Sequence, residues 1–501
     1  MTDQQRNGLK SVKAMILFGE THGSNTVLHA PQELLEDAGP NSQTSDFLLS
    51  EYGGITRPGK RHSLRAIVSA KKCAIKIAKM FKKKHDWRYS LIDCDQAAET
   101  IPSYWLTLED ESKLKVRDLL SWENLSKWSF NIFDVHEVLK GKNVLVFVAW
   151  AIIAAPEAQH AMDLACSNLT VGQQEQEKDE NVDEDEANAT PRKITDFNDR
   201  EGYQFLSKLF ITEGTLVEFL VAIENRYNSD VSYHNEVHAA DVVQSLHALL
   251  QMGGKKFAAT DWELFSVLIA AVCHDVGHSG VNNNFHINSR SELALLYNDE
   301  SPLENMHAAT TFQLIMGENR DEKLDIFARC LVEDVTKAKA MIIKVILSTD
   351  MKKHFSKMNF IQGLVMNNNN DDADDGITQT PCFDHTCMDT RHDLLSFLCH
   401  MADISNATKD IAITTKWCHK VLEEFYNQGE LEKELNIPIS PNCDRDAQTC
   451  AQSQIGFIKF IILPSFTLLG QLLPQVEEEI VPQIEKNLKI WGNRREQELQ
   501  S

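Results

Sequence analysis

The chain has 501 residues, 43% hydrophobic and 25% charged, which is the composition of a soluble globular protein with one large domain or two to three average ones. Its 73 acidic residues outnumber its 50 basic residues and give a net charge of −23. This balance argues against a nucleic-acid polymer as the main partner, because such a partner needs a basic face. A small phosphate substrate remains open, because bound cations can supply positive charge.

Three features of the chain favour a cytoplasmic location, with peripheral membrane contact as an option. The eleven cysteines are scattered, form no Cys-x-x-Cys pair and fall partly within apolar helical patterns, which is typical of reduced thiols. The first ten residues contain no apolar run, so we expect no secretory signal. The longest apolar run, residues 144–155, is too short to span a bilayer and predicts a buried helix.

Residues 1–118 are predicted to form an N-terminal extension. Residues 1–59 show no clear periodicity, and we expect a poorly ordered segment or a small appendage. Residues 60–84 contain ten lysines and arginines, no acidic residue, and apolar residues at helical spacing. This pattern predicts a basic amphipathic helix over residues 60–87. Such a helix either binds calmodulin or an anionic membrane surface, or docks on the acidic body of the same chain.

Dense helical patterns begin near Ser121 and predict an all-α, compact multi-helix domain over residues 119–495. Two segments interrupt the pattern. Residues 173–187 hold eight Asp or Glu and cannot bury enough apolar surface to order themselves, so they predict an acidic insert or linker. Residues 366–378 are rich in Asn and Asp and predict a flexible loop, because the glutamate that ends a calcium-binding loop is missing.

Ligand-type side chains occur in three separate stretches. His234 and His238 lie four residues apart, so a helix would place them on one face. His274 and Asp275 end one apolar run and Asp403 ends another. A lone histidine in an apolar helix is more often a core residue, but these stretches together favour a metal site. Imidazole with carboxylate suits zinc, and carboxylate with water suits magnesium or manganese.

These stretches belong to a set of six motifs that resembles the catalytic domain of class I 3′,5′-cyclic-nucleotide phosphodiesterases, in the same order and at similar spacing. The motifs are Tyr-His-Asn-x-x-His-Ala-Ala-Asp at 233–241, His-Asp-x-x-His-x-Gly-x-x-Asn at 274–283, Tyr-Asn-Asp-x-Ser-x-Leu-Glu-Asn at 297–305, Ser-Thr-Asp-Met at 348–351, Ala-Asp-Ile-Ser-Asn at 402–406 and Ser-Gln-Ile-Gly-Phe at 453–457. Weaker similarity extends from Ser121 to about Trp491.

The resemblance implies a role for each matching metal-site residue. A zinc ion would be held by His238, His274, Asp275 and Asp403. Asp275 would also bridge to a magnesium or manganese ion, so two divalent cations are expected.

It also implies roles around these ions. His278 and Glu304 would orient water molecules at the second ion, and His234 would be the general acid.

The same resemblance implies a nucleotide pocket. Gln454 would hydrogen-bond the purine edge, and Phe457, three residues further along a helix, would stack on its face. Tyr233, Asn406 and Met351 would line the pocket. Taken alone, Phe457 is more often a core residue, whereas an amide buried in an apolar helix needs partners.

The implied activity is metal-dependent hydrolysis of cyclic AMP, cyclic GMP or both to nucleoside 5′-monophosphates, which ends a cyclic-nucleotide signal. Cations would neutralise the anionic phosphate, and a proton supplied to the poor 3′-alkoxide leaving group contributes about 10²–10⁴ in rate. Two alternatives remain: another nucleotide hydrolase of the histidine–aspartate superfamily, or a catalytically inactive cyclic-nucleotide-binding protein.

The chain departs from the family pattern at positions that supply no metal ligand. Gly277 and Ser279 replace an acidic residue and a proline, and we expect altered loop packing there. Met306 replaces a common histidine beside the second ion, and we expect lower activity or a changed metal preference.

Overall fold

Segments with apolar residues at three- and four-residue spacing are helical in the structure. The computed structural model describes residues 101–176, 200–318, 320–368, 387–446 and 449–498. No strand occurs within these ranges, and the predicted all-α class is confirmed. The chain forms two compact units, residues 1–93 and residues 94–501. Every described residue belongs to the second unit. The predicted helix 60–87 lies outside the described residues, and the predicted boundaries of the 119–495 domain stay a prediction.

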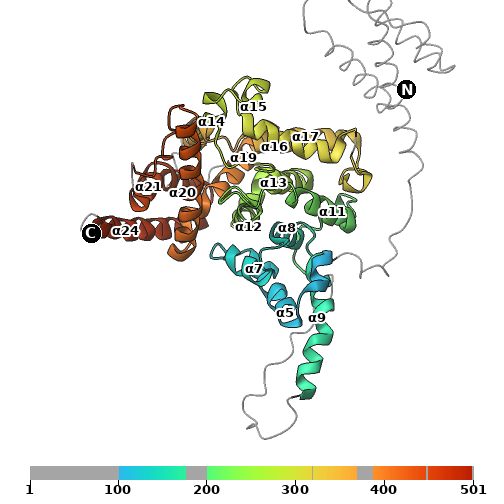
Figure 1. Cartoon of the computed structure of the whole chain (residues 1–501). Helices are drawn as coiled ribbons and strands as arrows, with labels where there is room; N and C mark the ends of the chain where they lie inside the picture. The colour runs from blue at the N-terminus through green and yellow to red at the C-terminus, as the bar shows by residue number, and fades with distance from the viewer. Residues whose placement is uncertain (1–100, 177–199, 319, 369–386, 447–448, 499–501) are drawn as a thin grey trace, which may run out of the picture. The chain divides into compact units, whose positions relative to one another are not determined.

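The first group of helices leads from the start of the described chain to the centre of the domain (Figure 1). These are α5 (Asp110–Leu119), α6 (Trp122–Leu125), α7 (Ile132–Val138), α8 (Val144–Ile153), α9 (Glu157–Gln176), α10 (Phe205–Lys208), α11 (Glu213–Glu224), α12 (Glu236–Gln251) and α13 (Asp261–Cys273).

The second group completes the domain. These are α14 (Asn283–Asn288), α15 (Glu292–Leu296), α16 (Pro302–Met316), α17 (Val332–Leu347), α18 (His354–Asn368), α19 (Met388–Asp403), α20 (Ile411–Glu434), α21 (Cys450–Phe457), α22 (Leu463–Leu472), α23 (Pro474–Glu479) and α24 (Val481–Glu498).

Buried helices form the middle of the core. All ten residues of α8 are fully buried, which confirms the buried helix predicted for the apolar run at residues 144–155. Helix α8 packs on α11 and α12, and α12 packs on α13 and α19. Because α12, α13 and α19 pack on one another, side chains at their ends are brought together although they lie far apart in sequence.

Side-chain caps fix where the helices begin. Asn235 precedes α12, and its Oδ1 accepts hydrogen bonds from the backbone N–H groups of Val237 and His238. Thr260 caps α13 in the same way. Such caps satisfy N–H groups that have no partner inside the helix, so they decide which residue is the first helical one.

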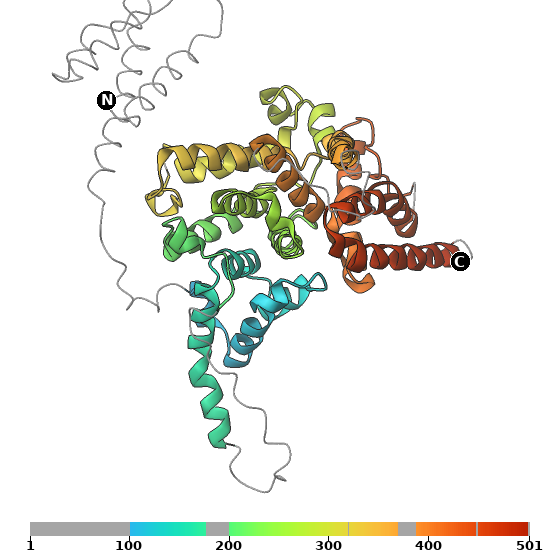
Figure 2. The same cartoon turned by 180° about the vertical axis from the view of Figure 1, so that it is seen from behind.

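A buried polar network ties both ends of the domain to its centre. Lys409 is 1% exposed, and its Nζ donates to Trp128 O at 3.0 Å and to Gln244 Oε1 at 3.3 Å. Asn487 on α24 donates from Nδ2 to Ala407 O at 3.0 Å and to Lys409 O at 2.8 Å. Figures 1 and 2 show α24 beside α21 at this end of the domain. The segment that follows Asp403 is thereby held from two sides.

Two predicted interruptions begin later than expected. Helix α9 continues to Gln176, and helix α18 continues to Asn368. The first residues of the acidic insert (173–187) and of the flexible loop (366–378) are therefore helical, because each helix propagates past the last strongly apolar turn. The rest of the flexible loop and residues 177–187 of the insert lie outside the described residues.

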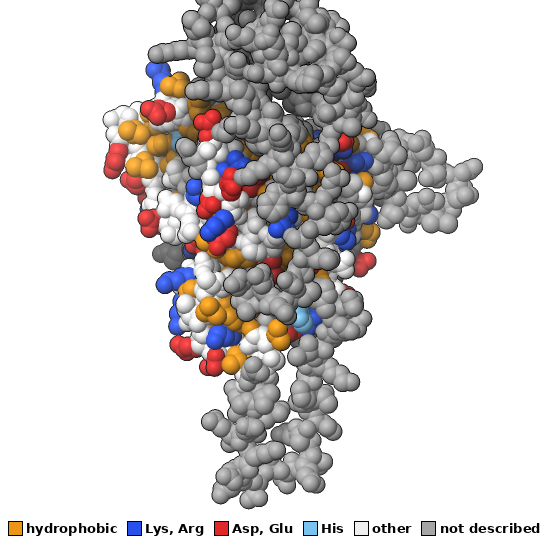
Figure 3. All heavy atoms as spheres, turned by 90° about the vertical axis from the view of Figure 1, so that its right-hand side faces the viewer, with side chains coloured by type: hydrophobic (Ala, Val, Ile, Leu, Met, Phe, Trp, Pro, Cys, Tyr) orange, Lys and Arg blue, Asp and Glu red, His pale blue; other side chains and the backbone are white. Residues whose placement is uncertain are grey.

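The surface carries charges of both signs. On the face in Figure 3, basic and acidic side chains are intermixed with hydrophobic ones among the coloured residues. Several exposed pairs are one helical turn apart, such as Lys115 with Glu111 and Lys337 with Glu333. Water and salt screen such exposed pairs, so they add little to the stability of the fold.

One described helical stretch, Cys450–Leu472, is long and apolar enough to cross a membrane, and the bent pair Val144–Ile153 with Glu157–Ser167 passes the same test when joined. Core helices of soluble proteins also meet these criteria, so the finding is weak evidence for a span.

Candidate metal centre

The ends of three core helices supply the central cluster. His238 lies in the first turn of α12, His274 is the residue directly after α13, and Asp403 is the last residue of α19. Asp275 follows His274 in the turn that leaves α13. The structure therefore brings together the four residues for which a zinc site is expected.

The interatomic distances show a compact group. His238 Nε2 lies 3.1 Å from Asp403 Oδ1, and His274 Nε2 lies 3.1 Å from Asp275 Oδ2 and 3.4 Å from Asp403 Oδ1. One ligand atom from each of the four side chains lies within 4.8 Å of all the others. This spacing suits a single cation between them.

The hydrogen bonds of His274 show which of its nitrogen atoms is available to a cation. Its Nδ1 lies 2.8 Å from the carbonyl oxygen of Ala271, so Nδ1 carries the proton and donates it. Its Nε2 therefore presents a lone pair to the cluster. This Nε2 and Asp275 Oδ2 are both buried and have no hydrogen-bond partner in the described structure. Buried polar atoms without partners are costly, and a divalent cation between them satisfies both.

The pKa shifts in and around the cluster also indicate a cation site. Burial lowers the pKa of His274, but the carboxylates of Asp275 and Asp403 outweigh it and raise this pKa well above its ordinary value. For Glu304, burial and the nearby carboxylate of Asp350 raise the pKa to about 7. Nearby carboxylates contribute to both shifts, and a bound cation would neutralise their charge.

His234 lies outside the helix that was expected to carry it. Because Asn235 caps α12, His234 belongs to the preceding loop, and the predicted helical face shared with His238 is wrong. The two imidazole rings still lie near each other, with ring centroids 5.7 Å apart. The spacing of the two histidines did not show that Asn235 would be the N-cap. Because Asn235 is the cap, the helix starts after it and His234 stays outside the helix.

Glu424 on α20 holds this loop and was not predicted from the sequence. Its Oε1 lies 2.5 Å from His234 Nδ1, and its Oε2 accepts the backbone N–H groups of Tyr233 at 2.9 Å and His234 at 3.0 Å. Burial lowers the pKa of His234, but Glu424 and Asp275 raise it to about 9. An acidic residue on the buried face of an amphipathic helix is the signal that could have identified Glu424.

His278 and Glu304 lie beside the cluster. His278 Nδ1 accepts the backbone N–H of Gly280 at 3.0 Å, so the neutral ring carries its proton on Nε2. The His278 ring stacks on that of His234 with centroids 4.2 Å apart. Glu304 on α16 accepts from Asn283 Nδ2 at 3.2 and 3.0 Å.

A further histidine, His307, was not predicted. It is 1% exposed, donates from Nδ1 to Val276 O at 2.8 Å, and places Nε2 3.7 Å from Asp275 Oδ1. It lies next to Met306, and a Cβ added at Gly277 would lie 3.4 Å from the Met306 sulfur. Gly277 has a φ of +81°, so the turn after Asp275 favours glycine there.

The residues expected in the nucleotide pocket lie on several elements. Asn406 donates from Nδ2 to the Tyr233 hydroxyl at 2.5 Å. The Tyr233 ring lies 5.4 Å from that of Trp417 on α20, and Trp417 lies 5.9 Å from His238. Tyr233, Asn406 and Trp417 are thus connected to the metal cluster by direct contacts.

Gln454 and Phe457 both lie on α21, as expected for residues on one helix. Gln454 is 5% exposed, and its Oε1 is buried without a hydrogen-bond partner in the described structure. Phe457 is partly buried against the core. Met351 lies on a separate short 3₁₀-helix and is 44% exposed.

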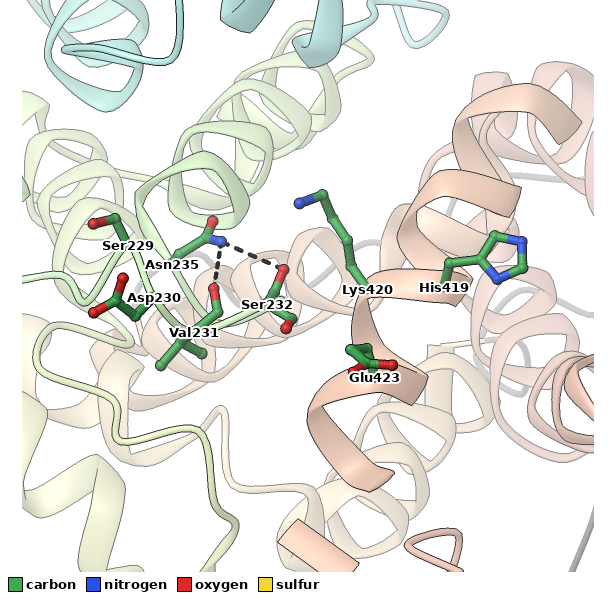
Figure 4. A pocket seen from close by; sticks show the side chains of 8 residues that line it. All are labelled: Ser229, Asp230, Val231, Ser232, Asn235, His419, Lys420 and Glu423. Carbon is green, nitrogen blue, oxygen red and sulfur yellow. Dashed lines mark hydrogen bonds between the residues drawn. The ribbon is translucent and has the colours of Figure 1, made fainter. Parts of the chain in front are cut away.

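A shallow hollow of about 480 Å³ adjoins the His234 loop (Figure 4). Ser232 and Asn235 line one side, and Lys420 and Glu423 of α20 line the other. No residue of the metal cluster lines it, so the hollow is separate from the cation site.

A family model matches half of the chain. The 3′5′-cyclic nucleotide phosphodiesterase model covers residues 233–484, which include every residue of the cluster.

Relatives and solved structures agree with this match. The chain is 36% identical over 284 residues to 3′,5′-cyclic-AMP phosphodiesterase 4C of Mus musculus, covering 57% of this chain and 40% of that protein. It is 35% identical over 268 residues to the dual specificity calcium/calmodulin-dependent 3′,5′-cyclic nucleotide phosphodiesterase 1B of Mus musculus, covering 53% and 46%. The chain therefore spans less than half the length of these two relatives.

A solved structure is similar as well. The phosphodiesterase domain of the RhoPDE fusion protein from the choanoflagellate Salpingoeca rosetta is 31% identical, with a TM-score of 0.54. The match covers 60% of this chain and 89% of that one.

Proposed function

The chain belongs to the 3′,5′-cyclic nucleotide phosphodiesterase family, and on that premise we propose that it hydrolyses cyclic AMP, cyclic GMP or both to nucleoside 5′-monophosphates. The observation that carries this proposal is the cluster of His238, His274, Asp275 and Asp403, the first three of them buried, inside the matched segment. The names of the two mouse relatives, one a cyclic-AMP enzyme and one of dual specificity, support both nucleotides as candidates. Such hydrolysis ends a cyclic-nucleotide signal.

We propose that the cluster binds zinc and that Asp275 also contacts a second ion, magnesium or manganese. Two imidazoles with two carboxylates are a donor set that suits zinc, and a site rich in carboxylate and water suits the second ion. Divalent cations bound there would neutralise the anionic phosphate and lower the pKa of a water molecule from about 16 towards 7. We also propose that His278 and Glu304 orient water molecules beside the cluster; the Nε2 proton of neutral His278 and the carboxylate of Glu304 support this role.

His234 is the proposed general acid. Glu424 accepts the Nδ1 proton, which fixes the ring and stabilises its protonated form, so the Nε2 proton is available for the 3′ oxygen as the phosphorus–oxygen bond breaks. The stacked His278 ring restricts the imidazole on one face.

Gln454 and Phe457 are the proposed purine contacts, and Tyr233, Asn406 and Met351 are proposed to line the pocket. The buried Gln454 amide oxygen without a partner supports a ligand contact, because a purine edge supplies the missing donor. An amide presents both a donor and an acceptor, so either purine can be accommodated.

Purified full-length protein assayed with cyclic AMP and cyclic GMP, in the presence of zinc and magnesium, tests the proposed reaction. We expect a 5′-monophosphate from at least one nucleotide. Turnover of neither nucleotide would contradict the enzymatic function, and binding without product would favour the inactive-sensor alternative.

Replacing Asp403 by asparagine tests the metal ligands. We expect Asp403→Asn to lose zinc, measured by elemental analysis, together with activity, because a neutral amide is a poorer ligand and the carboxylate nearest to His238 is removed. Asp389→Asn, at an exposed position of the same helix, is the matched control. Equal zinc content in both variants would refute the assignment of Asp403.

For regulation, we propose that residues 60–87 bind calmodulin or an anionic membrane surface, and that the protein is cytoplasmic. The support for the partner is the basic amphipathic pattern and the name of the calmodulin-dependent relative. The support for the location is the scattered placement of the cysteines in the sequence, without a Cys-x-x-Cys pair. A peptide of residues 60–87 should bind calcium-loaded calmodulin or vesicles containing phosphatidylserine. Affinity for neither would exclude both partners.

A further inference from the structure

Three buried polar side chains lie along one face of α20. They are spaced four residues apart and are Glu424, Gln428 and Glu432, each 4% exposed or less. Glu424 holds the loop that carries His234, whereas the proposed reaction uses neither of the other two. Buried polar groups need partners, so the contacts of Gln428 and Glu432 show which parts of the domain this face of α20 joins.

The Gln428 amide makes two hydrogen bonds to one residue of the loop before α14. Its Oε1 accepts the backbone N–H of Asn282 at 2.8 Å, and its Nε2 donates to Asn282 Oδ1 at 3.1 Å. Asn282 Oδ1 also accepts the backbone N–H of Phe285 at 3.0 Å and so caps α14. Gln428 therefore fixes both the main chain and the side chain of this cap residue.

Glu432 determines the orientation of the Gln428 amide. Its Oε1 accepts from Gln428 Nε2 at 2.8 Å and from Ser440 Oγ at 2.6 Å, and its Oε2 accepts the backbone N–H of Ser440 at 2.7 Å. An ionised carboxylate can only accept hydrogen bonds, so the nitrogen of the Gln428 amide faces Glu432. The amide oxygen is thereby directed at the backbone N–H of Asn282.

Asn283, the next residue of the loop, connects it to the metal site. Its Nδ2 donates to both oxygens of Glu304, at 3.2 and 3.0 Å, and its Oδ1 accepts the backbone N–H of Leu303 at 3.0 Å. Asn283 thus holds the carboxylate of Glu304 and the first turn of α16 together. On the same helix, three residues after Glu304, His307 places its Nε2 3.7 Å from Asp275 Oδ1. This face of α16 is therefore turned towards the cluster.

We propose that Gln428 is a positioning residue for the second divalent ion. Gln428 fixes Asn282, the adjacent Asn283 aligns the carboxylate of Glu304, and Glu304 orients water molecules at that ion. This role rests on the proposed second-ion site and deepens it by adding a residue of α20. Within the described residues, Gln428, Asn282 and Asn283 make no hydrogen bond to the four proposed zinc ligands, so zinc binding should not depend on them.

Removing the amide has a defined effect on the second ion. The backbone N–H of Asn282 loses its acceptor and Glu432 loses its donor, so the loop before α14 is no longer tied to α20. Asn283 then holds the Glu304 carboxylate in a less defined position. Loss of an outer partner of this kind typically weakens metal affinity by about 10–100-fold.

Titration with Mn²⁺ of the full-length protein, supplied with one equivalent of zinc, tests this role when free Mn²⁺ is measured by electron paramagnetic resonance. We expect Gln428→Ala to raise the Kd for Mn²⁺ by about tenfold while its zinc content stays that of the unchanged chain. Gln428→Met keeps the length of the side chain without its hydrogen bonds. It should raise the Kd to a similar extent, and it decides the question if the alanine variant does not fold. An unchanged Kd, or an unchanged chain that binds no Mn²⁺, would overturn the proposal.

Two control variants separate positioning from stability. Asn427→Ala changes an exposed neighbour on α20 and should leave the Kd for Mn²⁺ unchanged. Ile413→Ala removes a buried apolar side chain of the same helix, so it should lower Tm and still leave the Kd unchanged. A Kd raised as much by Ile413→Ala as by Gln428→Ala would show that lost stability alone accounts for the effect.

A double variant tests whether Gln428 acts through Asn283. Asn283→Ala should itself raise the Kd for Mn²⁺, because Glu304 loses its direct donor. If the two residues act in series, Gln428→Ala combined with Asn283→Ala should have a Kd no higher than that of Asn283→Ala alone. Multiplied effects would contradict the series. If the protein binds Mn²⁺ as expected but hydrolyses neither nucleotide, the proposed function fails and the role of Gln428 at the ion stands.

Discussion

At the scale of single residues, the site depends on which ring nitrogen of each histidine carries the proton. The backbone carbonyl of Ala271 fixes the proton of His274 on Nδ1, and the backbone N–H of Gly280 fixes that of neutral His278 on Nε2. His274 therefore offers a lone pair on Nε2, and neutral His278 offers a proton on Nε2. Both assignments follow from contacts with the main chain, so they are built into the fold before any ligand binds.

The pairing of Glu424 with His234 leads to a prediction about pH. In Glu424→Gln the charge that raises the pKa of His234 is removed, so the pKa falls and less of the acid is protonated at neutral pH. We expect kcat to fall by about tenfold or more and the alkaline limb of the pH–rate profile to move to lower pH. Glu423→Gln, at the exposed neighbouring position, should leave the profile unchanged. An unshifted limb in Glu424→Gln would rule out this role.

At the scale of elements, the helices are placed by charged groups at their ends as well as by apolar packing. Glu263 in the first turn of α13 is paired with Arg391 at 2.8 Å and lies 3.3 Å from His392, both in α19. It also accepts the backbone N–H of Ala259 at 2.6 Å. This buried pair joins the two helices whose opposite ends carry His274 and Asp403.

Glu263→Gln tests this connection through stability. Burial raises the pKa of Glu263, but His392 and Arg391 lower it to about 2, below its ordinary value of 4.5. A carboxylate whose folded-state pKa is depressed adds stability above its unfolded pKa, and this contribution is lost as the pH falls towards the folded value. We expect the variant to lose about 2–3 kcal/mol at pH 7, with the difference shrinking between about pH 5 and 3.

Urea unfolding from pH 7 to pH 3 measures this difference. The exposed pair of Glu333 with Lys337 supplies the control, and Glu333→Gln should change stability far less than Glu263→Gln does at pH 7, because solvent screens this pair. A loss in Glu263→Gln that stays constant with pH would contradict the electrostatic origin.

At the scale of the whole domain, the C-terminal helix holds the segment that follows Asp403. Asn487 is fully buried and is the donor to Ala407 O and Lys409 O, while Gln483 donates to its Oδ1 at 2.9 Å. We expect Asn487→Ala to leave two buried carbonyl groups without this donor and to cost about 2 kcal/mol, or roughly 4 °C in Tm. Calorimetry against Asn493→Ala, an exposed position of the same helix, is the measurement. Equal Tm values would show that α24 does not hold this segment.

Local sequence patterns were sufficient to predict the helical fold class and part of the metal site. The buried helix at residues 144–155 was predictable because a run without polar residues can only be buried, and His274 and Asp403 were predictable as polar ends of apolar runs. His307 was not, because a single polar aromatic residue within an amphipathic pattern looks like a surface position until its neighbours are known. Glu424 shares a helix face with Trp417, seven residues before it, but that spacing does not reveal its partner His234.

By itself, the sequence determined the residue types that can bind a cation, the helical class and the buried helix at residues 144–155, because these depend on periodicity and composition over a few turns. Only the tertiary structure decided that His234 precedes its helix and meets Glu424, and that His307 lies beside Asp275. Such contacts join residues far apart in the chain, and they are set by how buried helix faces pack together, which no local pattern encodes.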